Sequence, residues 1–498
     1  MTTTTNRPRA LVIGAGFGGL GAAYELSRDG LADVTVLEKA EDIGGVWREN
    51  TYPGAACDVP SNLYSYSFAR KTDWGRRYAE QPDILGYIRD TADRFGLRDL
   101  VRTGVEVTSA EYDDASATWR VRTSQGETLE ADILIPAVGQ LSRPALPSIP
   151  GLESFAGPSF HSAEWRHDID LTGKRVAVLG TGASAIQFVP RIRRVAKHVV
   201  VFQRSAPYVV PKLDRAYTDG HHSAFRRVPG FAAAMRALIW YLSEFFSLAL
   251  TKAAPLARLV GWWASANRLR HIKDPVLRDK VTPDYAIGCK RVLFSSDWYP
   301  ALACDNVDVE TESITEVTAT GVRTADGRHH EVDVIIYGTG FKATEFLSPI
   351  TVSGRGGLSL QSVWADGARA HLGMAVPGFP NLFLIYGPNT NLGSSSIILM
   401  MEQQARYIRQ LVEELIRSGD RRAFEVRPEV EQAYDTDVQT RLDNGVWTTC
   451  DSWYRTDSGR VTTNWPGLVH EYQRRTTTVA FSDYRQVLPT SIAEGVDA

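Results

Sequence analysis

The chain has few cysteines, and their arrangement argues against two kinds of site. Only four occur among the 498 residues, at positions 57, 289, 304 and 450, and no two of them form a Cys-x-x-Cys pair. Structural zinc sites and dithiol redox centres typically use cysteines at short spacing. We therefore expect neither. The ten histidines also show no ligand spacing with cysteines or acids, so no metal site is predicted.

A strong charge of either sign is also missing. The formal net charge is -3, from 55 Lys and Arg against 58 Asp and Glu. Such a balance gives no field that would attract nucleic acid or an anionic membrane, so no nucleic-acid partner is expected.

The first eight residues lack the apolar core of a secretory signal, which predicts a cytoplasmic protein. A Gly-x-Ser-x-Gly hydrolase motif is absent from the sequence.

Long apolar runs are missing too. The most apolar stretch, residues 231–266, is interrupted by Arg236, Glu244, Lys252 and Arg258. Because a membrane span needs about 20 consecutive apolar residues, the sequence predicts no transmembrane segment.

What the chain does contain is a pair of glycine-rich turns with the same spacing. The first, Gly14-x-Gly16-x-x-Gly19, follows an apolar strand at residues 11–13. The second, Gly180-x-Gly182-x-x-Ala185, follows an apolar strand at residues 176–179. A strand, this turn and a helix form the phosphate-binding part of a dinucleotide site. One such turn is weak evidence, but two in this context predict two dinucleotide sites.

The residue that should read the ribose has opposite charge in the two units. The next strand ends at Glu38 in the first unit and at Arg204 in the second, each twenty-four residues after the first glycine. A carboxylate accepts hydrogen bonds from a ribose 2′-hydroxyl, whereas a cation accommodates a 2′-phosphate. The first unit should therefore hold FAD or NAD and the second NADP, with hydride passing between them. This combination indicates an NADPH-dependent flavoprotein.

The predicted fold class is α/β, with two Rossmann-like dinucleotide-binding domains, one for FAD and one for NADP. We expect the FAD-binding domain at 1–150, the NADP-binding domain at 151–333, and a second part of the FAD-binding domain with the C-terminal region at 334–498. Two segments that each follow an apolar strand and end in glycine, Ala137-Val138-Gly139 and Gly338-Thr339-Gly340, indicate where the chain crosses between the domains.

A mainly helical insertion is expected at about 208–283, within the NADP-binding domain. It is rich in apolar residues, namely Leu238, Ile239, Trp240, Leu242, Phe245, Phe246, Trp262 and Trp263. Such stripes on helices usually pack into a core, so we expect packing with some character of a substrate lid. A surface that touches a membrane is the alternative.

Between the two fingerprints lies the motif Phe155-x-Gly157-x-x-x-His161-x-x-x-Trp165. With it the chain resembles the Baeyer-Villiger monooxygenases of the class B flavoprotein monooxygenases. That family usually continues with Pro or Asp, whereas this chain has Arg166. Six further segments resemble the family in the same order: Gly44–Trp47, Tyr52–Asp58, Tyr64–Phe68, Val201–Arg204, Gly288–Arg291 and Gly338–Phe341.

The resemblance implies roles for individual residues. Arg291 matches the catalytic arginine, and Asp58 matches the carboxylate that pairs with it and orients it. A guanidinium suits this role because it stays protonated and stabilises developing negative charge without reorganising. His161 is expected to couple the domains. The expected cofactor-binding residues are Gly14, Gly16, Phe17, Gly19, Glu38, Gly45, Trp47, Tyr52, Asp58, Tyr64, Gly180, Gly182, Ala185, Arg204, Ser205, Lys290, Gly340 and Phe341.

Two further matches leave alternatives open. Trp453 corresponds either to a family tryptophan near the nicotinamide and substrate or to a residue of the core. The turn at Asn389, Thr390 and Asn391 is expected near the flavin ring, with a simple surface turn as the alternative.

The implied reaction uses FAD, NADPH and O2. Hydride reduces the flavin, O2 adds to form a C4a-peroxyflavin, and its anion attacks a small apolar ketone to give an ester or lactone. One alternative is a flavin monooxygenase that oxygenates sulfur or nitrogen. Another is a non-catalytic flavoprotein that senses NADPH. The sequence indicates neither a particular ketone nor an oligomeric state.

Overall fold

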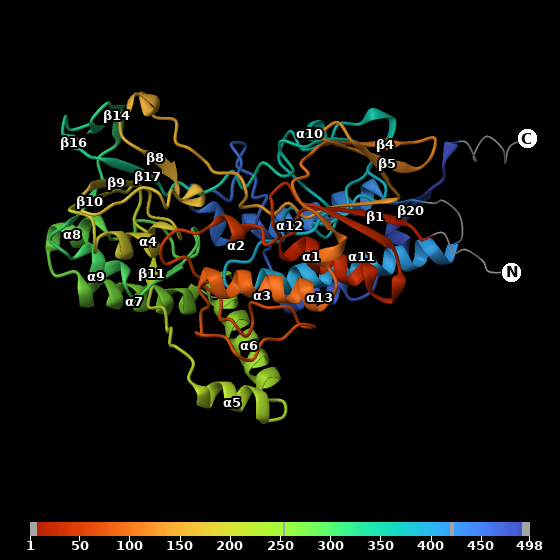
Figure 1. Ribbon diagram of the computed structural model, residues 1–498, viewed down its shortest axis with the longest axis horizontal. Coiled ribbons are helices and arrows are strands. Elements are labelled where there is room, and N and C mark those ends of the chain that lie inside the picture. Colours follow the sequence, from red (N-terminus) through yellow and green to blue (C-terminus); the bar gives the residue numbers. More distant parts are fainter. Residues whose placement is uncertain (1–6, 252–253, 419–422, 491–498) are drawn as a thin grey trace, which may run out of the picture.

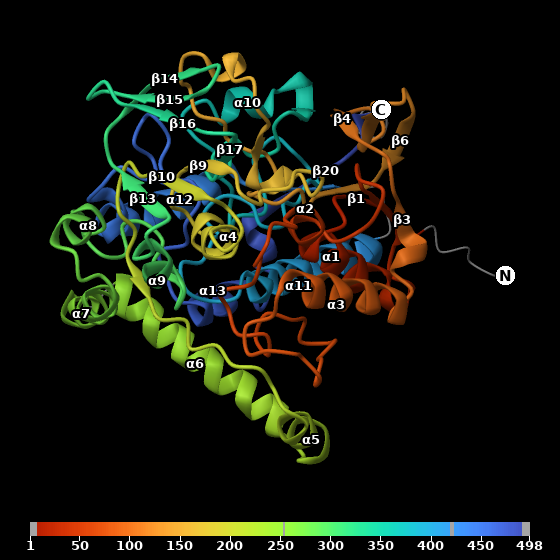
Figure 2. The same cartoon turned by 60° about the vertical axis from the view of Figure 1, so that its left-hand side comes forward.

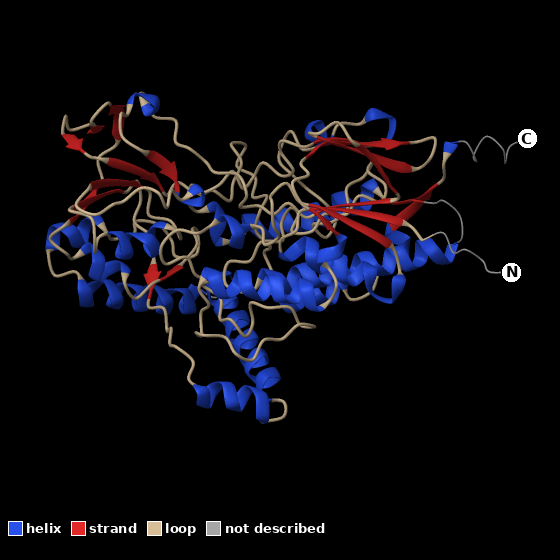
Figure 3. Ribbon diagram, viewed as in Figure 1, coloured by secondary structure: helices blue, strands red, loops and turns tan. Residues whose placement is uncertain are grey.

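The computed structural model describes residues 7–251, 254–418 and 423–490. In Figures 1 and 3 the strands gather in two groups at opposite ends of the molecule, and long helices run along the side below them. The two groups contain the two parallel sheets that the glycine-rich turns predicted.

The first parallel sheet has the strand order β3, β2, β1, β7. Its strands are β1 (Arg9–Ile13), β2 (Asp33–Leu37), β3 (Val101–Arg102) and β7 (Ile133–Pro136). Helix α1 (Phe17–Ser27) contacts α11 (Ile397–Ser418), and α3 (Gln81–Arg94) joins the same core. Strand β1 is almost wholly apolar because strands of a covered parallel sheet are buried on both faces.

The second parallel sheet has the order β13, β10, β9, β17, β8. Its strands are β8 (Ser159–His161), β9 (Arg175–Leu179), β10 (His198–Phe202), β13 (Val307–Glu310) and β17 (Val334–Tyr337), with α4 (Ala185–Ile192) and α9 (Trp298–Leu302) packed nearby. Counted from the strand before each glycine-rich turn, both sheets have the order third, second, first, fourth, and the second sheet adds β8 at the edge beside the fourth strand. This repeat confirms the predicted α/β class with two Rossmann-like units.

Each parallel sheet is accompanied by an antiparallel one in the same place along the chain. The first contains β4 (Val107–Asp113), β5 (Thr118–Thr123), β6 (Thr128–Ala131) and β18 (Thr351–Ser353), the last of which pairs in parallel with β4. The second contains β14 (Ile314–Thr318), β15 (Gly321–Thr324) and β16 (His329–Glu331). Strands β4, β5 and β6 precede β7 along the chain, and strands β14, β15 and β16 precede β17.

The two segments that cross between the units run side by side. Pro144 and Phe341 form an antiparallel bridge. The backbone N–H of Ala145 donates to the oxygen of Gly340 (2.9 Å), and the N–H of Lys342 donates to the oxygen of Arg143 (3.0 Å). We call residues 143–145 and 340–342 the crossing ribbon. The two chain connections between the units are therefore hydrogen-bonded to each other.

The insertion is mainly helical, as predicted. It contains α5 (Asp219–Arg227), α6 (Phe231–Thr251), α7 (Ala254–His271) and α8 (Pro275–Lys280), flanked by the short strands β11 (Val209–Val210) and β12 (Leu293–Phe294). In Figure 2, α6 projects along the lower edge from α7 toward α5.

Two expectations about the insertion can be compared with the structure. By length and composition alone, residues 231–248 of α6 could cross a membrane, and 11% of this window is buried, which does not contradict the expectation of no transmembrane segment. The expected packing is only partly present. Ile239 is buried, at 6% exposed, but Leu242 is 55% exposed and Trp262 is 67% exposed. The packing is partial because only one face of these helices lies against the rest of the protein, and the other face is exposed.

The C-terminal region returns to the first unit. It contains α10 (Leu360–Val363), α11, β19 (Ala423–Val426), α12 (Pro428–Asp443), α13 (Val469–Thr476) and β20 (Tyr484–Val487). Residues of α11, α12 and α13 share one core with α1 and β1. The short helix α2 (Val46–Glu49) follows the first unit's second strand.

Candidate active site

The turn between β1 and α1 forms the first glycine-rich loop. Gly14 has a φ of +101°, and a Cβ there would lie 2.8 Å from the carbonyl oxygen of Ala137, so glycine is required. At the end of β2, the Glu38 carboxylate accepts hydrogen bonds from the backbone N–H groups of Ala15 (2.8 Å) and Ala40 (2.9 Å). Helix α1 has no side-chain cap at its start. Its first N–H groups are therefore suited to a phosphate.

The turn between β9 and α4 repeats this geometry. Gly180 has a φ of +105°, and a Cβ there would lie 2.4 Å from the oxygen of Gly338. A Cβ on Gly182, by contrast, would approach only the oxygen of Gly338, at 3.9 Å. Ala185 is fully buried at the start of α4, whose N-cap Ser184 makes no side-chain capping bond. The space at Gly182 thus suits the close approach of a pyrophosphate.

Cations and hydroxyls gather beyond the end of β10. The Nζ of Lys290 donates to the Oγ of Ser205 (2.8 Å), and the Oγ1 of Thr181 donates to the backbone oxygen of Ser205 (3.4 Å). Burial lowers the pKa of Lys290, and the positive charge of nearby Arg204 lowers it further. Arg204 itself is exposed. A bound phosphate would offset the repulsion between these two cations.

Arg291 and Asp58 form an ion pair across the two units. The Nε and Nη2 of Arg291 donate to one carboxylate oxygen, Oδ2 of Asp58, at 3.1 and 2.7 Å. Burial alone would raise the pKa of Asp58, but the charge and hydrogen bonds of Arg291, with the charge of Lys212, lower it below its ordinary value. The charge of Asp58 in turn raises the pKa of Arg291. Both groups therefore remain charged at neutral pH.

Three residues beside this pair were not identified from the sequence. Lys212 is half-buried with its Nζ 5.1 Å from the centre of the Tyr78 ring, and its charge acts on Asp58. Tyr386 and Tyr454 both interact electrostatically with Arg291. Burial raises the pKa of Tyr454 to about 12. The sequence indicated Tyr454 only indirectly, because it adjoins Trp453, which was singled out as a possible site residue.

The predicted aromatic residues of the first unit lie in contact with one another. The Nε1 of Trp47 donates to the hydroxyl of Tyr64 (3.0 Å), and the Tyr64 and Phe17 rings meet edge to face with centroids 5.3 Å apart. A Cβ on Gly45 would lie 3.0 Å from the Cα of Gly16, so these two backbones approach closely. The structure therefore brings the loop after β2 against the first glycine-rich turn.

Tyr52 lies at the contact between the two units. Its hydroxyl donates to the Oε1 of Gln187 (3.0 Å), and its ring centroid is 6.0 Å from that of Phe188. Gln187 also donates from Nε2 to the oxygen of Ala56 (2.9 Å). Gln187 and Phe188 belong to α4, so the segment that leads to Asp58 is attached to the second unit.

His161 is buried beside the crossing ribbon. It is 1% exposed, its Nδ1 accepts the N–H of Ala163 (3.1 Å), and its ring centroid lies 5.5 Å from that of Phe341. Burial lowers its pKa, so the ring is neutral at pH 7. Gly340, beside Phe341, has a φ of +82°. This placement agrees with a structural rather than a chemical role.

A disulfide joins Cys289 to Cys450, which the sequence did not predict. Spacing could not show it because the two cysteines are 161 residues apart. The bond links the segment with Lys290 and Arg291 to the segment with Trp453. Trp453 is 41% exposed, so assignment to the core is wrong.

The turn at residues 389–391 is buried, so the alternative of a surface turn is wrong. Asn389, Thr390 and Asn391 are 3%, 0% and 4% exposed. The Nδ2 of Asn391 donates to the Oδ1 of Asn464 (2.8 Å), and its Oδ1 accepts the hydroxyl of Tyr386 (2.8 Å). The turn therefore connects to a tyrosine beside Arg291.

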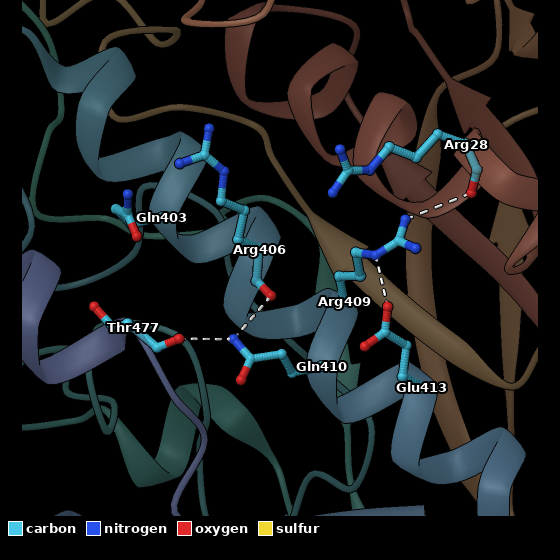
Figure 4. Close-up of a pocket in the computed structure, with 7 residues that line it drawn as sticks. All are labelled: Arg28, Gln403, Arg406, Arg409, Gln410, Glu413 and Thr477. Carbon is cyan, nitrogen blue, oxygen red and sulfur yellow. Dashed lines mark hydrogen bonds and ion pairs between the residues drawn. The ribbon is translucent and has the colours of Figure 1, made fainter.

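A separate cavity of about 430 Å³ lies between α11 and the segment that follows α1 (Figure 4). Arg28, Arg406 and Arg409 are among its lining residues, but each is already paired. Arg28 and Arg406 contact Glu25, and Arg409 contacts Glu413 and Asp29. Cations neutralised in this way make a weak anion site.

The residues present fit two dinucleotides. Each glycine-rich turn leaves an uncapped helix start, with an acid after the second strand of the first unit and cations after the second strand of the second unit. An arginine and an aspartate join the units. These features define a flavoprotein oxidoreductase that binds two dinucleotides.

Comparison with known proteins agrees. A model of the flavin-binding monooxygenase-like family matches residues 7–351. A Baeyer-Villiger monooxygenase from Streptomyces coelicolor is 44% identical over 492 residues, covering 98% of this chain and 95% of the relative. A structure of oxidized steroid monooxygenase bound to NADP is 32% identical, with a TM-score of 0.85, covering 97% of this chain and 100% of the other. A structure of OTEMO with FAD and NADP is 27% identical, with a TM-score of 0.88, covering 96% and 99%.

The chain therefore belongs to the Baeyer-Villiger monooxygenases, within the flavin-binding monooxygenase-like family.

Proposed function

We propose that the chain is an FAD-dependent monooxygenase that consumes NADPH and O2 and inserts one oxygen atom next to the carbonyl of a small apolar ketone, giving an ester or lactone. The single observation that carries this proposal is the Arg291–Asp58 ion pair across the two units. The similarity to Baeyer-Villiger monooxygenases supports it.

Arg291 supplies a fixed positive charge where negative charge develops on the reacting oxygen atoms. Because Asp58 accepts two hydrogen bonds from its guanidinium, the cation is oriented before the substrate arrives. A preorganised charge of this kind stabilises a transition state without reorganising. Tyr386 and Tyr454 shape the same region, and Lys212 adds a second cation near Asp58.

The other predicted residues bind the cofactors. FAD, when bound, supplies the acceptor for hydride and the site at which O2 is activated. The β1–α1 turn holds its pyrophosphate and Glu38 its ribose, while Phe17, Gly45, Trp47, Tyr52 and Tyr64 form the surroundings of the flavin. The Gly180–Ala185 turn holds the NADPH pyrophosphate, and Arg204, Ser205 and Lys290 bind the 2′-phosphate. His161, Gly340 and Phe341 couple the two units.

We also propose the division of the chain into an FAD-binding domain, residues 1–150 and 334–498, and an NADP-binding domain, residues 151–333. The order of four strands that the two parallel sheets share supports this division. The sequence predicts a cytoplasmic location. The Cys289–Cys450 disulfide argues against it, because such bonds are rare in reducing compartments.

The test is product analysis with Arg291→Ala. The purified protein is incubated with NADPH, labelled O2 and a panel of ketones and aryl sulfides. The wild type should give esters or lactones with one labelled oxygen. The variant should retain flavin while ester formation falls roughly 100-fold or more, as for loss of an oxyanion-stabilising donor.

Exposed Arg270→Ala is the matched control and should keep wild-type ester yield. Equal ester yield from wild type and Arg291→Ala would contradict the proposed role. Labelled sulfoxides without esters would assign the chain to oxygenation of heteroatoms. NADPH binding without oxidation in air would favour a sensor.

A further inference from the structure

Helix α6 carries a row of exposed large apolar side chains. Leu238, Tyr241, Leu242 and Phe245 are 52%, 65%, 55% and 57% exposed. Their spacing of three and four residues places them on one face of the helix. Contiguous apolar patches of this kind are rare on soluble proteins unless something binds them.

The opposite face of α6 is fixed to the body of the protein by polar groups. The buried Arg236 donates from Nη1 to the backbone oxygen of Asn62 (2.9 Å). The buried Glu244 accepts the backbone N–H groups of Val469 (3.0 Å) and His470 (3.2 Å). A helix held in this way cannot cross a bilayer, because crossing would expose both charges to hydrocarbon. Its apolar face can only lie against a surface.

Helix α7 extends the exposed surface. Leu259, Trp262 and Leu269 are 60%, 67% and 46% exposed, and Arg258 and Arg270 lie exposed beside them. Their spacing again places them on one face. In Figure 2, α7, α6 and α5 follow one another along the lower edge of the molecule, and in Figure 1 α6 and α5 project below its body. The two helices that carry the exposed apolar residues contact each other.

The charge of this region is mainly positive. We call residues 219–274 the helical arm. It contains eight Lys and Arg and three acids, Asp219, Glu244 and Asp274, of which Glu244 is buried. Of the cations, Arg226, Arg227, Arg258, Arg270 and Lys273 are exposed. The whole chain has a net charge of -3, so the positive charge of the arm is local.

We propose that the helical arm docks onto the surface of a bilayer containing anionic phospholipids. The apolar row would enter the boundary between headgroups and acyl chains, Tyr241 and Trp262 would lie at headgroup level, and the exposed cations would contact lipid phosphates. A second copy of the chain fits less well, because a two-fold contact through this surface would bring cations together.

The experiment measures sedimentation of the full-length, flavin-loaded protein with vesicles. One vesicle preparation is phosphatidylcholine alone, and the other contains phosphatidylglycerol as well. The wild type should bind the anionic vesicles at least tenfold more tightly, and added salt should weaken this binding. Phe245→Glu and Trp262→Glu should each reduce binding to anionic vesicles at least tenfold, whereas Arg226→Glu with Arg227→Glu should reduce the preference for anionic lipid.

Matched controls lie on the second unit. Val195 is 50% exposed and Lys197 is exposed, so Val195→Glu and Lys197→Glu make similar changes outside the arm and should bind as the wild type does. Flavin absorbance and thermal unfolding show whether each variant is folded. Failure of the wild type to bind either vesicle would overturn the proposal, as would equal binding by folded arm variants. A dimer that Trp262→Glu dissociates, without vesicle binding, would assign the surface to a second copy.

Discussion

Arg204 should decide which coenzyme the second unit accepts. Arg204→Gln removes one of two cations near Ser205, so the dissociation constant of NADPH should rise roughly 10- to 100-fold, as expected for a lost charge-assisted hydrogen bond. NADH lacks the 2′-phosphate and should bind as before. Titration of coenzyme binding to the oxidised protein measures both constants.

Arg194→Gln is the control for this change. Arg194 is exposed and belongs to the same unit, but it lies after α4 rather than after β10. It should leave both constants unchanged. Equal loss of NADPH and NADH in Arg204→Gln would contradict the charge argument.

The charge of Asp58 should persist over the neutral pH range. Because its pKa in the folded protein is lowered, its contribution to stability is present above the unfolded pKa of about 3.9 and is lost as pH falls through the lower folded value. The difference in unfolding free energy between wild type and Asp58→Asn should thus stay constant from about pH 5 to about pH 8. Denaturant titrations at several pH values test this, and a change in the difference near pH 7 would contradict it.

Residues within one local unit could be identified from the sequence, whereas most long-range neighbours could not. Glu38 and Arg204 follow from a fixed distance to the first glycine of each turn. Asp58 and Arg291 are 233 positions apart, and only the resemblance to a family suggested their pairing. Lys212 was missed because no local pattern reports which side chains the tertiary fold places beside a carboxylate.

Within the second glycine-rich turn, two glycines should behave differently when changed to alanine. Gly180→Ala forces a Cβ within 2.4 Å of the Gly338 oxygen and should destabilise the fold. Gly182→Ala meets the same oxygen only at 3.9 Å, so stability should be retained. Its methyl group would instead occupy space that the pyrophosphate needs, and NADPH binding should weaken about tenfold or more.

Thermal unfolding and coenzyme titration separate these outcomes. Gly86→Ala in α3 is the control, because a Cβ there meets nothing within 4 Å. It should leave coenzyme binding unchanged and stabilise the helix by up to about 1 kcal/mol. Unchanged NADPH binding in Gly182→Ala would contradict the predicted approach of the pyrophosphate.

The helices of the insertion could be predicted, but their exposed faces could not. Apolar residues occur all around α6, for example at the consecutive positions Leu238, Ile239 and Trp240, so periodicity does not distinguish the covered face from the open one. The covered face is chosen by polar partners in distant segments, Asn62 for Arg236 and Val469 for Glu244. Those partners are known only from the fold.

Across the whole molecule, the disulfide should stabilise the folded chain. It links residues 161 positions apart, and closing a loop of this length in the unfolded chain corresponds to an upper limit of about 5 kcal/mol. Cys289→Ser with Cys450→Ser should therefore lower the thermal midpoint. Scanning calorimetry checks this, with free Cys304→Ser as the control. Equal midpoints for the double variant and the wild type would show that the bond adds no stability.

The crossing ribbon has a consequence for how such a protein could arise. The backbone N–H of Lys342 donates a hydrogen bond to the oxygen of Arg143. The chain therefore leaves the first unit and returns to it at almost the same point. Everything between them can be regarded as a cassette whose two ends meet. A gene could gain or lose such a cassette as one uninterrupted stretch of codons, and the host sheet, closed by β7 on one side of the junction, would keep all four of its strands.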